Sequence, residues 1–292
     1  MSDQLTRTLS QEAGILVLVA STTTLAQEGA RRHQTSPLAT MMLGRGLTIG
    51  ALMGGLLKNR QRLALKLGAN GPVSKLIVDS DSDGRVRGYI SPTVIDLASD
   101  GPPPGSLGIF GNVGMLTVNK DLLQRDPSEG SVILVDSDID ANFDYYFQQS
   151  EQIPSRVRTY IGLDADERVT YAGGTLVQAM PGYDPSTLQD IFARLDDAMA
   201  QRNWPTEQVP PAAQLLKTIY GPLDFTVLET SEPTFRCSCS VERSRQALRM
   251  LGKDELTALI EEGNAVVECH FCHEAYHFDR AALTELRATL DE

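Results

Sequence analysis

All four cysteines of this 292-residue chain lie in its last fifth, as the two close pairs Cys237-Ser-Cys239 and Cys269-His-Phe-Cys272. Few folds are open to a short segment that must bring four sulfur atoms to one point, because a shared ion would fix both pairs relative to each other. Zinc is the expected ion, since four thiolates at about 2.3 Å satisfy its tetrahedral geometry. The pattern predicts that Cys237, Cys239, Cys269 and Cys272 bind zinc. Four buried cysteines without a ligand would explain the clustering poorly.

The two pairs differ in the chemistry that their spacing allows. Cys237 and Cys239 are two residues apart, so in an extended segment both side chains point to one face and can bind one ion. A disulfide between them would close a small, strained ring. Cys269 and Cys272 have the spacing of zinc knuckles and also of thiol–disulfide redox motifs. From these residues alone, a permanent structural zinc site and a redox switch are equally supported.

Charge and hydrophobicity limit the partners and the location of the chain. The formal charge is −12 at pH 7, which disfavours nucleic acid and anionic membranes as partners. The apolar run at residues 15–20 is too short for a signal sequence, and the longest one, at 46–57, is shorter than a membrane span. We therefore expect a cytoplasmic protein, in which cysteines are thiolates or metal ligands.

Residues 1–180 have the pattern of a mixed α/β core domain. A long apolar segment from Pro37 to residue 57 predicts a helix, with Ser36 as its cap, and residues 142–153 predict a second helix that ends before Pro154. Turn signals separate the strand candidates. These strand candidates are residues 15–19, 63–67, 73–78, 86–90, 115–118, 132–135, 156–161 and 168–177.

Residues 181–235 differ in character, since they contain seven of the fifteen prolines of the chain. Two amphipathic segments, 187–199 and 212–220, predict helices between these prolines. Such a segment is neither a flexible tether nor an independent core, so we expect a helical connector that must pack on another surface to stay folded.

Residues 236–292 form the third part, a small module that contains all four cysteines. Helices are predicted at residues 244–251 and 253–262 and from residue 280 onward, with Gly252 and Gly263 ending the first two. A module of this size is marginal without a metal ion, so removal of zinc is expected to unfold it. The predicted fold class is α+β, made of the mixed core, the helical connector and the zinc-binding module.

Other charged motifs are interpreted as structural. The sequence Asp79-Ser-Asp-Ser-Asp-Gly84 resembles half of a calcium loop, but Ile90 stands where the loop needs a bidentate glutamate, so an acidic hairpin turn is expected. With four cysteines available, we expect His270, His273 and His277 to be surface or supporting groups and not ligands. The arginines near the first cysteine pair are expected to form a solvated helix face or to support the thiolates electrostatically. They are Arg236, Arg243, Arg245 and Arg249.

Motifs of the common catalytic sites are absent from the sequence. Neither a Gly-x-Ser-x-Gly elbow nor a phosphate-binding Walker loop occurs. The only histidine outside the cysteine module is His33. We therefore predict no catalytic residues and no enzymatic activity.

Four longer motifs carry a resemblance to a known family. They are Tyr146-Phe-Gln-Gln-Ser-Glu-Gln-Ile-Pro-Ser155, Gly173-Gly-Thr-Leu-Val-Gln-Ala-Met-Pro-Gly182, Arg236-Cys-Ser-Cys-Ser-Val-Glu-Arg243 and Val267-Glu-Cys-His-Phe-Cys-His-Glu-Ala-Tyr-His-Phe278. Together with the chain length and the proline-rich connector, they resemble the redox-regulated 33 kDa chaperonin family (heat shock protein 33) over nearly the whole chain. Each of the four family ligands corresponds to a cysteine here.

The resemblance implies an ATP-independent chaperone, a holdase, that binds unfolding client proteins under oxidative stress. In such a protein zinc keeps the reduced form folded and inactive. Oxidation then forms the disulfides Cys237–Cys239 and Cys269–Cys272, releases zinc and unfolds the connector and the zinc module. The family also implies a homodimer on activation. Less well supported alternatives are a zinc-stabilised nucleic-acid-binding regulator and a thiol oxidoreductase that uses Cys269 and Cys272.

Overall fold

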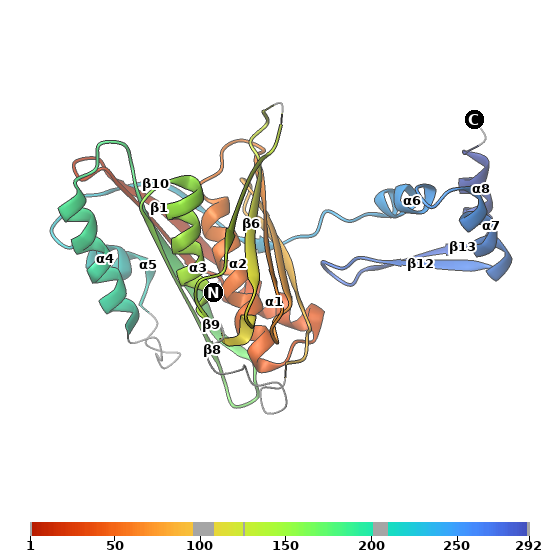
Figure 1. Ribbon diagram of the computed structural model, residues 1–292, viewed down its shortest axis with the longest axis horizontal. Coiled ribbons are helices and arrows are strands. Elements are labelled where there is room, and N and C mark those ends of the chain that lie inside the picture. The colour runs from red at the N-terminus through yellow and green to blue at the C-terminus, as the bar shows by residue number, and fades with distance from the viewer. Residues whose placement is uncertain (1, 96–107, 125, 201–209, 291–292) are drawn as a thin grey trace. The chain divides into compact units, whose positions relative to one another are not determined.

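The computed structural model describes residues 2–95, 108–124, 126–200 and 210–290 (Figure 1). The chain divides into two compact units, Met1–Arg236 and Cys237–Glu292, which are described separately below. The first unit contains β1 (Gln4–Ser10), β2 (Ile15–Ser21), α1 (Thr23–His33), α2 (Pro37–Gly54), β3 (Arg62–Ala69), β4 (Lys75–Asp81), β5 (Arg85–Ser91), η1 (Gly108–Phe110), β6 (Gly114–Asp121), β7 (Ser128–Ile133), α3 (Ile139–Tyr146), the π-helical turn η2 (Phe147–Glu151), β8 (Ser155–Leu163), β9 (Val169–Ala179), α4 (Pro185–Ala200), α5 (Ala212–Tyr220), β10 (Thr226–Ser231) and β11 (Thr234–Phe235).

Two sheets make up the frame of the first unit. Sheet A has five strands in the order β10-β1-β2-β9-β8, and sheet B has six in the order β11-β5-β4-β3-β6-β7. All neighbouring strands are antiparallel except β11, which pairs with β5 in parallel. The mixed helix and sheet content confirms the predicted α+β class.

Helix α2 lies between the two sheets and is buried on nearly all sides (Figure 1). A helix that is apolar all round is expected in such a position. Glycines allow the close approach: a Cβ atom at Gly44 would lie 2.5 Å from Ile161 Cδ1 in sheet A, and one at Gly46 would lie 2.7 Å from Leu76 Cδ2 in sheet B. The helix predicted from Pro37 is confirmed, but the Ser36 side chain accepts a hydrogen bond from the Ile95 N–H instead of capping it.

The connector helices α4 and α5 pack on the other face of sheet A. Alternate residues of β2 point to opposite faces. Ile15, Val17 and Val19 therefore join the core formed with α4 and α5, whereas Leu16 and Leu18 join the core around α2. Because both cores are apolar, the sequence of β2 is one continuous apolar run.

The connector also contributes two strands that its sequence pattern did not predict. Strand β10 extends sheet A by pairing with β1, and β11 extends sheet B by pairing with β5. Residues 181–235 are therefore not only helical. Their last part crosses from one sheet to the other.

Most of the other predicted elements of the core occur near their expected positions. Helix α3 begins at Ile139, and the helical path continues as η2 to Glu151, three residues before Pro154. Strand β7 ends at Ile133, which is two residues earlier than predicted. The turn between β4 and β5 is the expected acidic hairpin: Asp81 Oδ1 accepts the N–H groups of Asp83 and Arg85, at 3.0 and 3.1 Å.

The second unit contains α6 (Val241–Arg249), α7 (Lys253–Glu262), the antiparallel hairpin β12 (Asn264–Glu268) and β13 (Ala275–Asp279), and α8 (Arg280–Ala288). Gly263 adopts a left-handed conformation, with φ of 93°, and ends α7 as predicted. The buried core of this unit is small. It consists of Leu248, Leu256, Ala265, Phe278, Leu283 and Leu286. Within the described residues of the chain, no helix combines the length and the apolarity that crossing a membrane requires.

Candidate metal centre

An irregular segment and a turn of the second unit carry the cysteines. Cys237 and Cys239 lie in the irregular segment before α6, whose first turn is capped by Ser240 Oγ accepting the Arg243 N–H at 3.2 Å. Cys269 and Cys272 lie in the loop between β12 and β13. The Cys269 carbonyl accepts the N–H groups of Cys272 and His273, at 3.2 and 2.8 Å, so the loop is a tight turn that places both sulfur atoms on one side.

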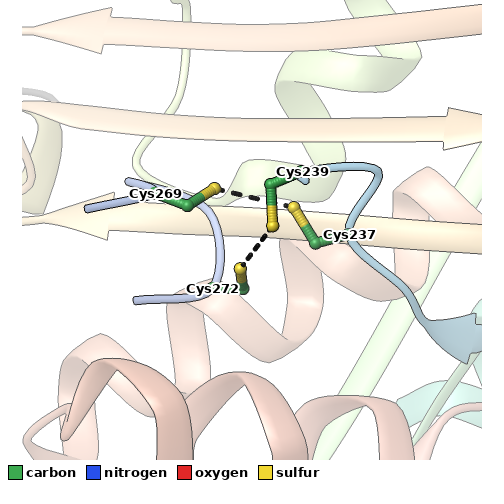
Figure 2. A group of neighbouring side chains, drawn as sticks. All are labelled: Cys237, Cys239, Cys269 and Cys272. Carbon is green, nitrogen blue, oxygen red and sulfur yellow. Dashed lines mark hydrogen bonds between the residues drawn. The ribbon is translucent and has the colours of Figure 1, made fainter. Parts of the chain in front are cut away.

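The four Sγ atoms converge to within 4.8 Å of one another. Figure 2 shows two contacts that join the two segments: Cys237 Sγ lies 3.6 Å from Cys269 Sγ, and Cys239 Sγ lies 3.3 Å from Cys272 Sγ. These distances are far longer than a disulfide bond of about 2.05 Å. They are close to the sulfur–sulfur separation of about 3.8 Å that a tetrahedron of thiolates around zinc requires, given metal–sulfur bonds of about 2.3 Å.

The surroundings of the sulfur atoms are partly shielded from water. Burial raises the pKa of the Cys269 and Cys272 thiols. The Tyr276 hydroxyl donates a hydrogen bond to Cys239 Sγ at 3.2 Å, and this bond raises the pKa of Tyr276. Four thiols gathered in this way lose their protons only if a cation stabilises the resulting thiolates. A divalent metal ion does so. The number, type and spacing of the donors therefore fit a zinc ion.

The neighbouring histidines and arginines have supporting positions. His273 Nδ1 pairs with the Glu268 carboxylate, and both side chains are exposed, at 43% and 57%. Among the described residues, the cluster of possible metal ligands contains the four cysteines alone. Arg243 donates to Ser238 Oγ at 2.6 Å and so orders the residue between Cys237 and Cys239.

Two contacts at this site were not expected from the sequence. Tyr276 reaches Cys239 because the β12–β13 pairing brings it beside the sulfur cluster, and Arg243 reaches Ser238 because α6 begins directly after the first cysteine pair. A tyrosine four residues after Cys272 and an arginine four residues after Cys239 were the only signals available. Neither spacing is specific without the fold.

Comparison with known proteins places the chain in a family. The model of the family described as Hsp33 protein matches residues 3–279. The chain belongs to the Hsp33 protein family. This result confirms the resemblance noted from the motifs.

Relatives in this family match the chain over nearly its full length. The 33 kDa chaperonin of Geobacter sulfurreducens is 39% identical over 294 residues, covering 99% of this chain and 96% of the relative. That of Pelobacter propionicus is 41% identical over 300 residues, covering 99% and 95%. The crystal structure of the 33 kDa chaperonin (heat shock protein 33 homolog) from Thermotoga maritima superposes with a TM-score of 0.86 at 29% identity, covering 100% of this chain and 99% of that one.

Proposed function

We propose that this chain is a redox-regulated, ATP-independent chaperone of the cytoplasm that holds unfolding client proteins during oxidative stress. The observation that carries the proposal is the position of the connector. Helices α4 and α5 cover an apolar sheet face, and the four-cysteine cluster follows the connector directly in the chain. A change at the cysteines can therefore control whether that face is covered.

In the reduced state, Cys237, Cys239, Cys269 and Cys272 would hold one zinc ion. The ion supplies folding free energy, which the second unit needs because the hydrophobic cluster in its described residues has six buried members. We assign three roles along the chain: a core at residues 1–180, a metastable linker at 181–235 and a redox-sensing module at 236–292.

Strand β11 is the last element of the linker before the module, and it is held to the core. The N–H of Thr234 donates to the Gly84 carbonyl and that of Arg236 to the Val86 carbonyl, each at 2.9 Å. The Phe235 ring lies 5.3 Å from the guanidinium carbon of Arg32 in α1, within the range of a cation–π contact. Cys237 follows Phe235 by two residues, so disorder that begins at the cysteine reaches β11 first and β10 next.

Oxidation would convert the four thiolates to the two disulfides Cys237–Cys239 and Cys269–Cys272. Each disulfide forms when two thiolates give up two electrons to an oxidant such as peroxide, which takes up two protons and leaves as two water molecules. The four Sγ atoms are gathered for one ion, with contacts of 3.6 and 3.3 Å across the two segments, so closing a bond of about 2.05 Å within each pair requires the cluster to rearrange. The loss of all four thiolates removes the ligands of the ion and, with it, the stability of the module.

Unfolding of the linker would expose the apolar face of sheet A together with the apolar sides of α4 and α5. Surfaces of this kind bind other polypeptides. The residues that become accessible include Ile15, Val17, Val19 and Val177 on the sheet and Leu188, Ile191, Leu195, Leu216 and Ile219 on the helices. We propose unfolded client proteins as the partners of this surface and a homodimer as the active form.

The decisive experiment measures zinc release and light scattering of a denatured client together while peroxide is added. The two signals are expected to change in parallel, with aggregation suppressed in proportion to the amount of protein. Suppression of aggregation by a sample that keeps its zinc and its folded second unit would contradict the proposal. Catalytic turnover of a disulfide substrate would instead favour an oxidoreductase.

A further inference from the structure

The contact between α4 and the edge strand of sheet A contains two arginines among apolar residues. Arg156 Nη1 donates to Asp196 Oδ2 at 2.5 Å, and Arg158 Nε donates to Asp196 Oδ1 at 2.7 Å. The guanidinium carbon of Arg156 also lies 4.4 Å from the centre of the Phe192 ring. Both arginines therefore hold α4. Arg158 does so through its ion pair with Asp196, and Arg156 through its ion pair with Asp196 and its contact with the Phe192 ring.

The strand register places these arginines beside the apolar surface that α4 covers. Arg156, Arg158 and Tyr160 alternate along β8 and so point to one face, and Tyr160 belongs to the core that α4 and α5 complete. Arg156 is the register partner of Val177, which belongs to the same core. The face is therefore apolar in its centre and cationic at its β8 edge.

The two arginines would differ once α4 has left. Arg158 Nη1 also donates to Asp144 Oδ2 of α3 at 2.7 Å, so Arg158 would keep a carboxylate partner. In the part of the chain that the structure describes, Arg156 forms its ion pair and its aromatic contact with α4, whereas Asp144 of α3 attracts its charge without a hydrogen bond. Departure of α4 would thus leave the Arg156 guanidinium without its hydrogen-bonded carboxylate and its ring contact beside an apolar surface, where charged hydrogen bonds are stronger than in water.

Helix α4 shows which ligand this surface fits. Phe192 and Asp196 are four residues apart, so they lie on the same side of the helix, together with the buried Leu188 and Leu195. We propose that the uncovered face of sheet A binds helical client segments in which an acidic residue follows an aromatic residue by four positions, with Arg156 as the selecting residue. This inference rests on the proposed function, since it names the client chemistry of the surface that the linker is proposed to uncover.

The test uses a fluorescein-labelled peptide of residues 185–200 and the full-length, oxidised, zinc-free protein. Fluorescence anisotropy would give the Kd of the unchanged peptide and of its Asp196→Asn form, which is expected to bind about tenfold more weakly. The Asp197→Asn peptide is the matched control, because it loses the same charge from the neighbouring, exposed position. Its Kd is expected to stay within about twofold of that of the unchanged peptide.

The protein variants complete a double-mutant cycle. Arg156→Gln is expected to bind the unchanged and the Asp196→Asn peptides equally, whereas Arg156→Lys should keep part of the tenfold preference. Arg168→Gln removes an arginine whose side chain is 76% exposed and should keep all of it. Circular dichroism of the reduced, zinc-bound variants verifies that each has folded.

Three results would overturn the inference: no binding of the unchanged peptide, equal affinity for the unchanged and the Asp196→Asn peptides, or a preference that survives in Arg156→Gln. Light scattering of a denatured client in the same samples separates this failure from that of the proposed function. If oxidation suppresses aggregation but the peptides bind without charge preference, only the inference about client chemistry is wrong. If oxidation suppresses no aggregation, the proposed function itself is wrong.

Discussion

The hydroxyl oxygen of Tyr220 lies 3.2 Å from Thr8 Oγ1, although 212 residues separate the two in the chain. The same hydroxyl donates to the Ile15 carbonyl at 3.2 Å, and the ring stacks on Phe225 with centroids 4.6 Å apart. Burial raises the pKa of Tyr220 to about 12, so the hydroxyl stays protonated at neutral pH. One side chain of α5 therefore anchors the connector to the first two strands of the core.

This anchor leads to a prediction about the connector. Tyr220→Ala removes a fully buried ring and its hydrogen bonds, which costs about 3–5 kcal/mol for a large aromatic residue. In the zinc-bound, reduced protein, residues 181–235 should then be cleaved faster in limited proteolysis followed by mass spectrometry. Tyr220→Phe keeps the ring and should cost about 1 kcal/mol, with a much smaller change. A wild-type cleavage rate in Tyr220→Ala would show that this contact does not hold the connector.

The second prediction concerns the metal. Zinc analysis should find one ion per reduced chain, and replacing Cys272, the most buried ligand candidate, by serine should abolish stable binding. Because zinc binding contributes about 10 kcal/mol or more to the folding of small modules, chelation should unfold α6, α7 and α8 while the core at residues 1–180 stays folded. Hydrogen exchange by mass spectrometry checks the core and the module at once. Protection that persists in α6 to α8 after complete zinc removal would refute the prediction.

The third prediction concerns the order of oxidation. We expect Cys269 and Cys272 to form the first disulfide, because two intervening residues close the ring with less strain than the single residue between Cys237 and Cys239. Alkylation and mass spectrometry along a peroxide time course would follow each pair. The prediction fails if the 237–239 bond forms early.

The fourth prediction concerns pH. Burial raises the pKa of Asp144 to about 6, although Arg158 and the Val157 N–H both donate to its carboxylate at 2.7 Å. The folded state thus binds the proton more tightly than the unfolded state, whose pKa is near 3.8. The resulting stability is fully present below about pH 4 and is lost as the pH rises through about 6, by at most about 3 kcal/mol.

Asp144→Asn cannot titrate and tests this sign directly. Between pH 4 and pH 7, the free energy of unfolding of the first unit should fall more steeply in the wild type than in the variant, as measured by urea denaturation. Comparing the two proteins at each pH cancels the proton dependence of zinc binding, which both share. Parallel curves would mean that Asp144 titrates at an ordinary pKa.

Some elements were readable in the sequence because their signals are local. Helix α2 is a long apolar segment with Pro37 in its first turn, and β2 is an unbroken apolar run. Helix α1 has no such signal. Its first turn is capped from a distance, by Asp3 Oδ1 and Oδ2 accepting the N–H groups of Thr24 and Leu25 at 3.0 and 2.7 Å.

Strand β10 was missed for a related reason. Nearly all of its residues are exposed, so it shows no alternation between buried and exposed positions. It is a strand because β1 offers a sheet edge to pair with, and β1 lies more than 200 residues earlier in the chain. No local pattern could reveal that partner.

The amino-acid sequence by itself determined the donor set of the metal centre, because the number, identity and spacing of the cysteines are properties of the covalent chain before it folds. It also determined the two helices of the connector, since their periodicity is local. Only the tertiary structure decided what the connector covers, how β10 and β11 bind it to both sheets, and which arginines hold Asp196. Those contacts join residues far apart in the chain, and they are chosen by burial and charge pairing that exist only after folding.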